Sequence, residues 1–114
     1  MLTHEEQEVY QVSLRFVAMT ARINSSLPHH DTALADQLRR TALSIPIFIA
    51  EALAESSHVE QRAVLTDARS AAMECGALLD VLAMLGVAEP ADMKEAKRLL
   101  EKTTVLLAQK LGSV

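Results

Sequence analysis

The chain has 114 residues and a net charge of -4. This length fits one domain over residues 1–114, and the charge argues against a protein that mainly coats nucleic acid, which needs a cationic surface. Half of the residues are hydrophobic but only 3% are aromatic, a composition typical of helical bundles whose surface is partly covered by further copies. A single cysteine excludes an internal disulfide, and no apolar run approaches the ~20 residues that span a bilayer, so we expect a cytoplasmic protein.

The first predicted helix begins at Thr3 and ends in the turn-like residues 25–28. Thr3 and Glu6 have the spacing of a capping box, in which each side chain bonds the backbone of the other residue. Apolar residues then recur every seven positions and mark the buried side of the helix. These residues are Val9, Phe16 and Ile23.

The second predicted helix covers about residues 31–56, with Asp31 as its N-cap. Pro46 lies in its interior, where a proline removes one backbone donor at a cost of roughly 3 kcal/mol or more. Packing must therefore compensate, and we expect a continuous helix that is bent at Pro46. Residues 43–50 are apolar apart from Ser44, which indicates that this part of the helix is covered on more than one side.

The third and fourth predicted helices have clear start and stop signals. Ser57 and Glu60 form a second capping box, and Gly86 is suited to end the third helix. Pro90 suits the first turn of the fourth helix, which Gly112 ends. Because the connections are short, successive helices should be antiparallel neighbours, so the sequence predicts an all-α, up-down-up-down four-helix bundle.

Two blocks of the sequence carry a family resemblance. Residues 37–51 read QLRR-x-A-x-SIP-x-x-IAE, and residues 68–74 read ARSAAME. Both are similar to segments of the bacterial 23S rRNA intervening-sequence proteins, a four-helix-bundle family often encoded within insertions in 23S ribosomal RNA genes. The chain has Phe48 where that family usually has an asparagine.

The resemblance implies a left-handed bundle and a ring-shaped homopentamer. It also implies a relation to the accessory protein of diversity-generating retroelements, which works with a reverse transcriptase and nucleic acid. The pentamer and the nucleic-acid role are expectations from the resemblance alone.

Six residues are candidates for a structural role or for the oligomer interface. Arg39 and Arg40 are adjacent on the helix, so their side chains point about 100° apart. One of them could meet a neighbouring subunit or line a channel while the other pairs with Asp36. Asp36 and Arg40 have the favourable i, i+4 spacing for such a pair. Two solvated arginines, or contact with phosphate, are the alternatives. The six candidates are Arg39, Arg40, Pro46, Phe48, Glu51 and Glu74.

A cationic stripe on the fourth helix is the candidate for nucleic-acid contact. Lys94, Arg98 and Lys102 are spaced four residues apart, with Lys97 beside them. Residues 90–114 carry five Lys and Arg against three Asp and Glu, the reverse of the acidic balance in the rest of the chain. The alternative is a solvated helix face, since the stripe has no aromatic residue for base stacking and matches no RNA-binding motif.

No set of catalytic or metal-ligating residues can be assembled from the sequence. Glu51 and Glu74 could in principle bind a metal, but di-iron bundles repeat a Glu-x-x-His motif that occurs here only once, at Glu55 and His58. Cys75 has an apolar setting that favours a buried, inert thiol. We therefore expect no cofactor, no metal and no small-molecule substrate.

The sequence as a whole predicts a non-enzymatic oligomeric bundle that acts as a scaffold or interaction module. Its expected partners are further copies of itself and an RNA or a protein. The alternative is an RNA- or DNA-binding accessory protein that works with a nucleic-acid enzyme such as a reverse transcriptase. An enzyme is the third and weakest hypothesis.

Overall fold

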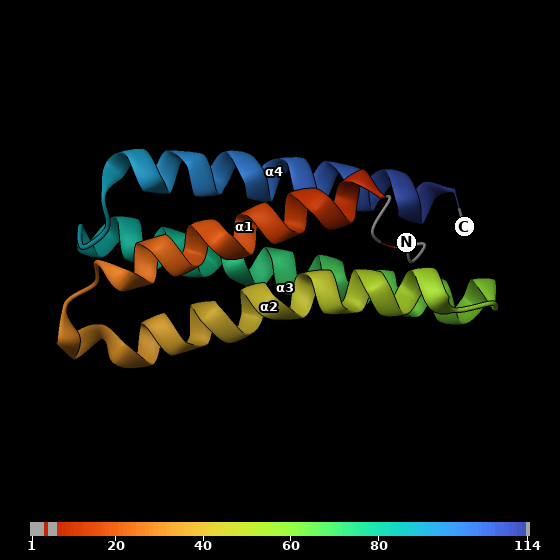
Figure 1. Ribbon diagram of the computed structural model, residues 1–114, viewed down its shortest axis with the longest axis horizontal. Coiled ribbons are helices and arrows are strands. Elements are labelled where there is room, and N and C mark those ends of the chain that lie inside the picture. Colours follow the sequence, from red (N-terminus) through yellow and green to blue (C-terminus); the bar gives the residue numbers. More distant parts are fainter. Residues whose placement is uncertain (1–3, 5–6, 114) are drawn as a thin grey trace.

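A computed structural model describes residue 4 and residues 7–113, and these residues fold into four long helices (Figure 1). No strand occurs within these residues, so the all-α prediction is confirmed. The capping box expected at Thr3 and Glu6 lies outside the described residues. The elements are α1 (Glu8–Ser25), the 3-10 turn η2 (His29–Asp31), α2 (Thr32–Ala54), α3 (His58–Leu85) and α4 (Pro90–Gly112).

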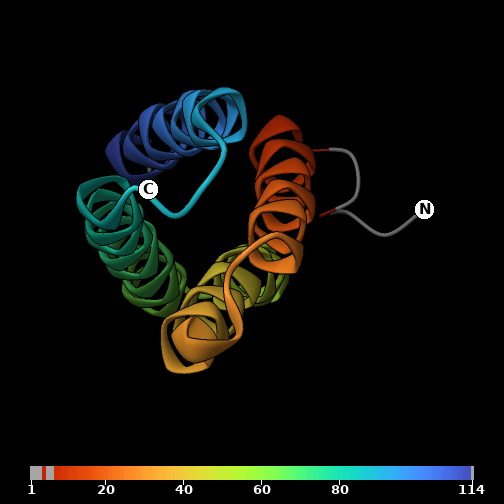
Figure 2. The ribbon, with the colours of Figure 1, turned by 90° about the vertical axis from the view of Figure 1, so that its left-hand side faces the viewer.

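The four helices stand at the corners of a square when the bundle is viewed from one end (Figure 2). Helix α1 contacts α2 and α4, and α3 contacts the same two helices, which gives an antiparallel bundle of 44 × 22 × 21 Å. The start of α1 and the end of α4 lie together, where the Lys110 ammonium group donates a hydrogen bond to the Gln7 side-chain oxygen. The predicted up-down-up-down arrangement is therefore confirmed.

Local signals fix most of the helix ends. The Ser57 hydroxyl oxygen accepts a hydrogen bond from the Glu60 backbone N–H at 3.3 Å, and Pro90 occupies the first turn of α4. Gly86 ends α3 with a φ of 66°, a left-handed conformation that favours glycine. Asp31 occupies the N-cap position of α2, as predicted, although its side chain makes no capping hydrogen bond, and it also ends the short η2 turn.

Helix α2 continues without a break through Pro46, as predicted, and its axis changes direction along its length (Figure 1). Pro46 is buried, and so are Ile45 and Ile49 on either side of it. The opposite side of the same segment is open, because Leu43 and Ile47 keep 37% and 55% of their surface exposed. A single chain therefore does not cover this segment on every side.

The core runs the whole length of the bundle between the four helices. At one close point Gly76 of α3 faces Leu100 of α4, whose Cδ2 would lie 3.7 Å from a Cβ atom added to the glycine. Burial contributes about 1.5–3 kcal/mol for each large apolar side chain. The largest fully buried apolar side chains are Val12, Phe16, Ile23, Leu38, Ile45, Ile49, Leu65, Leu79, Leu82 and Leu107.

Candidate interaction surface on α2 and α3

A groove of about 570 Å³ runs between α2 and α3. Three of the six candidates, Arg40, Phe48 and Glu74, line it, so the fold brings together residues from both blocks of the family resemblance. Phe48 is half-buried against the core. The remaining lining residues are Thr41, Ser44, Asp67, Ser70 and Ala71.

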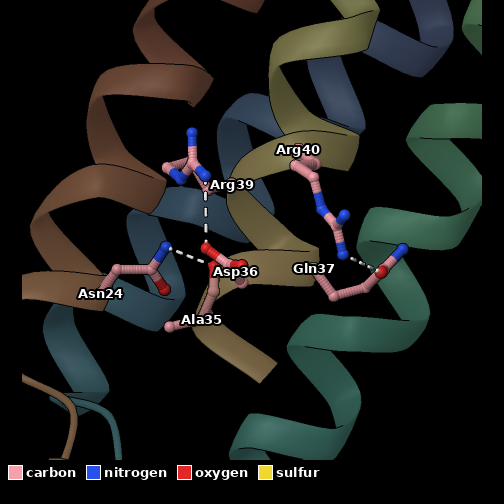
Figure 3. A network of polar contacts seen from close by, with 6 residues as sticks. All are labelled: Asn24, Ala35, Asp36, Gln37, Arg39 and Arg40. Atoms are coloured by element: carbon pink, nitrogen blue, oxygen red, sulfur yellow. Dashed lines mark hydrogen bonds and ion pairs between the residues drawn. The ribbon is translucent and has the colours of Figure 1, made fainter. Parts of the chain in front are cut away.

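A chain of hydrogen bonds connects the two walls of the groove. The Arg40 guanidinium donates to the Gln37 side-chain oxygen at 3.4 Å (Figure 3). The Gln37 amide donates to the Thr41 hydroxyl oxygen at 3.1 Å, and that hydroxyl donates to the Glu74 carboxylate at 3.1 Å. Glu74 is thus bonded to Thr41, which is only 6% exposed. Because Thr41 bonds both helices, it orients the Glu74 carboxylate at the groove.

Asp36 pairs with Arg39 and not with Arg40, so the predicted i, i+4 pair is wrong. The Arg39 guanidinium lies 3.2 Å from the Asp36 carboxylate (Figure 3). Both side chains are more than half exposed, and an exposed pair of this kind contributes about 1 kcal/mol or less. Glu51 is also exposed and does not line the groove.

One further polar contact in this region could not be read from the sequence. The Asn24 side-chain amide donates to the Ala35 carbonyl at 2.9 Å and ties the end of α1 to α2 (Figure 3). A lone asparagine near a helix end predicts a turn, not a partner eleven residues away.

The outer sides of α2 and α3 expose large apolar residues. Leu43 and Ile47 lie on α2, and Met73, Val81 and Met84 lie on α3. Met73 is 67% exposed and Met84 87%, although the helices that carry them are otherwise well packed. Several large apolar side chains exposed on the same two helices are typical of a surface that contacts another macromolecule.

Comparison with protein families gives a match that covers α1, α2, α3, most of α4 and both sequence blocks. The family model described as 23S rRNA-intervening sequence protein matches residues 5–109. The chain belongs to this family. No match was found among curated proteins. The groove of this intervening-sequence protein thus lies between the two segments that carry the family resemblance, residues 37–51 and 68–74.

The cationic stripe of this intervening-sequence protein is partly neutralised within the chain. Arg98 bonds Glu95 through two nitrogens, at 2.6 and 3.0 Å, and this hydrogen bonding lowers the pKa of the Glu95 carboxyl. Lys97 lies 3.8 Å from Asp80 of α3. Lys94 and Lys102 are exposed and form no ion pair with the described residues.

Within the described part of this intervening-sequence protein, no three His, Cys, Asp or Glu side chains gather to hold a metal ion. None of its helices is long and apolar enough to cross a membrane. Cys75 is buried, and this burial raises the pKa of its thiol to about 12, with a smaller effect from Glu74.

Proposed function

We propose that this intervening-sequence protein is a non-enzymatic interaction module that assembles with copies of itself and contacts them through its α2–α3 side. The observation that carries the proposal is the exposure of the large apolar residues Leu43 and Ile47 on α2 and Val81 on α3. Covering such residues removes apolar surface from water at about 25 cal/mol per Å². A bundle that stayed a monomer would leave them in contact with solvent.

The chemistry of the groove also favours a contact surface. Two of its polar side chains, Thr41 and Glu74, are hydrogen-bonded to each other across the two helices. The protonated Cys75 thiol is a poor nucleophile, and it suits a reducing compartment such as the cytoplasm. An enzyme would instead need an exposed nucleophile or base with a free partner.

The assembly that we propose is a closed ring, and the number of five copies follows from the family resemblance alone. A ring uses heterologous contacts, in which one patch of a copy meets a different patch of the next copy. The half-buried Phe48, at the position where the family usually has asparagine, places an aromatic side chain in the groove that such a contact would cover. Aromatic residues are common among those that dominate binding energy.

Light scattering coupled to size exclusion tests the proposal. We expect a mass that is a multiple of the 12.4 kDa subunit at micromolar concentration. Ile47→Asp should lower this mass, because it places a charge in the contact. Leu14→Asp, at an exposed position of α1, is the matched control and should not lower it. A wild-type mass of one subunit would contradict the proposal.

Binding of RNA or DNA, as by an accessory protein of a reverse transcriptase, is the second candidate function. It is favoured only by Lys94 and Lys102, the exposed cations of α4 that lack an ion pair among the described residues. Filter binding at low and moderate salt tests it, because phosphate contacts weaken steeply as salt rises. With a net charge of -4, we expect no retention of RNA or DNA at low micromolar protein. Salt-sensitive retention that Lys94→Glu with Lys102→Glu abolishes would establish the second function instead.

A further inference from the structure

Helix α3 carries an acidic stripe along the edge that faces α2. Glu60, Asp67 and Glu74 are seven residues apart, which is almost two helical turns, so they share one side of the helix. All three are exposed, and Asp67 and Glu74 also line the groove. These two carboxylates outweigh Arg40, the cation that lines the same groove, so the α2–α3 surface combines apolar residues with a net negative charge.

Helix α4 presents the opposite charge at a different corner of the bundle (Figure 2). Lys94, Arg98 and Lys102 lie along one exposed side of it. Arg98 is paired within the helix, whereas Lys102 makes no ion pair with any described residue. One copy thus has an acidic patch on α3 and unpaired positive charge on α4, and these two patches complement each other between copies.

The two patches also lie at matching heights along the bundle. Gly76 of α3 faces Leu100 of α4, and the helices are antiparallel. Glu74 lies two residues before Gly76 and Lys102 two residues after Leu100, so both lie about 3 Å from this contact in the same direction along the axis. The ion pair between Asp80 and Lys97 fixes the same register independently. If the copies of a ring are related by rotation about an axis parallel to the bundle, each residue keeps its height along that axis in every copy. Glu74 of one copy is then level with Lys102 of the next.

Apolar side chains accompany both members of this pair. Met73 precedes Glu74 and is 67% exposed, and Val105 lies almost one turn beyond Lys102 and is 51% exposed. In contact, these side chains would exclude water from the charged pair, and an ion pair is stronger where water is excluded.

We infer that copies of this chain associate head to tail, with the outer side of α4 in one copy seated against the outer side of α3 in the next, and with Lys102 paired to Glu74. The inference rests on the proposed self-assembly and goes beyond it by naming the two patches. It makes the interface heterologous, because neither patch meets its own copy.

Charge-reversal variants of the full chain test this pairing. Glu74→Lys and Lys102→Glu should each weaken assembly at least tenfold, measured as the concentration at which light scattering shows half-dissociation. The double variant restores opposite charges at every contact and should recover most of the loss. Glu55→Lys and Arg15→Glu make the same charge changes at exposed positions outside the two patches and should leave assembly unchanged.

Thermal unfolding by circular dichroism separates dissociation from misfolding, since Glu74→Lys also removes the hydrogen bond from Thr41. Lys102 makes no ion pair within residues 7–113, so Lys102→Glu should stay folded while it dissociates. An assembled wild type whose mass neither single variant changes would overturn the pairing and leave the proposed self-assembly intact. Dissociation by Glu74→Lys but not by Lys102→Glu would also overturn it, because Lys102 would then not be the partner of Glu74. A monomeric wild type would overturn both.

Discussion

Phe16→Ala is expected to lower the free energy of unfolding by about 3–5 kcal/mol, among the largest effects of any single substitution in this chain. Phe16 lies in α1, has no exposed surface and is one of only three aromatic residues in the chain. Its removal leaves a cavity that the surrounding aliphatic side chains of four packed helices can fill only in part.

Urea unfolding followed by circular dichroism measures this loss. It must be compared at one fixed protein concentration, because assembly itself adds to apparent stability. Leu14→Ala is the control on the same helix: Leu14 is 40% exposed, and we expect a loss of about 0.5 kcal/mol or less. Equal stabilities of the two variants would show that Phe16 is not in the core of the folded protein.

The Cys75 thiol is expected to react with alkylating reagents roughly a thousandfold more slowly in the folded protein than in denaturant at pH 8. Its pKa rises from an ordinary value of 9.0 to about 12, mainly because the thiol is buried. The reactive thiolate is therefore a much smaller fraction of the folded population, and burial also blocks the reagent. Mass spectrometry after timed alkylation gives both rates. Similar rates would place Cys75 at the surface.

The same shift in pKa makes stability depend on pH at the alkaline end. The folded state keeps the Cys75 proton above pH 9, where the unfolded chain releases it, so the contribution is complete below about pH 9 and is lost as pH rises towards 12. At pH 10 the loss is about 1.4 kcal/mol. The Cys75→Ala variant lacks this contribution, so its stability should fall less between pH 8 and pH 10. If the free energy of unfolding fell equally with pH in the two proteins, the thiol of Cys75 would not be buried in the folded state.

The helices could be predicted from the sequence because their signals are local. Ser57, Gly86 and Pro90 act on the backbone of their own turn, and the apolar repeat through Phe16 marks one side of one helix. Asp31 was correctly placed before α2, but the η2 turn that it also ends was not predicted. A short polar residue is favoured both in such a turn and at an N-cap, and the path of the chain after α1 decides whether the turn forms.

The contacts of the surface were harder to predict than the helices. Asp36 can reach an arginine three or four residues later, and the rotamers of exposed side chains, which no sequence pattern specifies, select Arg39. The bond between Thr41 and Glu74 depends on how α2 packs against α3. The ion pair between Lys97 and Asp80 likewise depends on how α3 packs against α4. The residues of the groove were thus recognised in part, whereas their partners needed the packing of the helices.

The hydrogen bond between Lys110 and Gln7 brings the end of α4 next to the start of α1. Each helix therefore has two neighbours, and it is connected to each of them by a turn of the chain or by this contact. A short linker across it, together with a break between α2 and α3, would connect the helices in the order α3, α4, α1, α2. Every helix would keep both of its neighbours in this circular permutant. The order of the helices along the polypeptide is therefore separable from their packing, and new chain ends can be placed at whichever turn lies farthest from a surface under study.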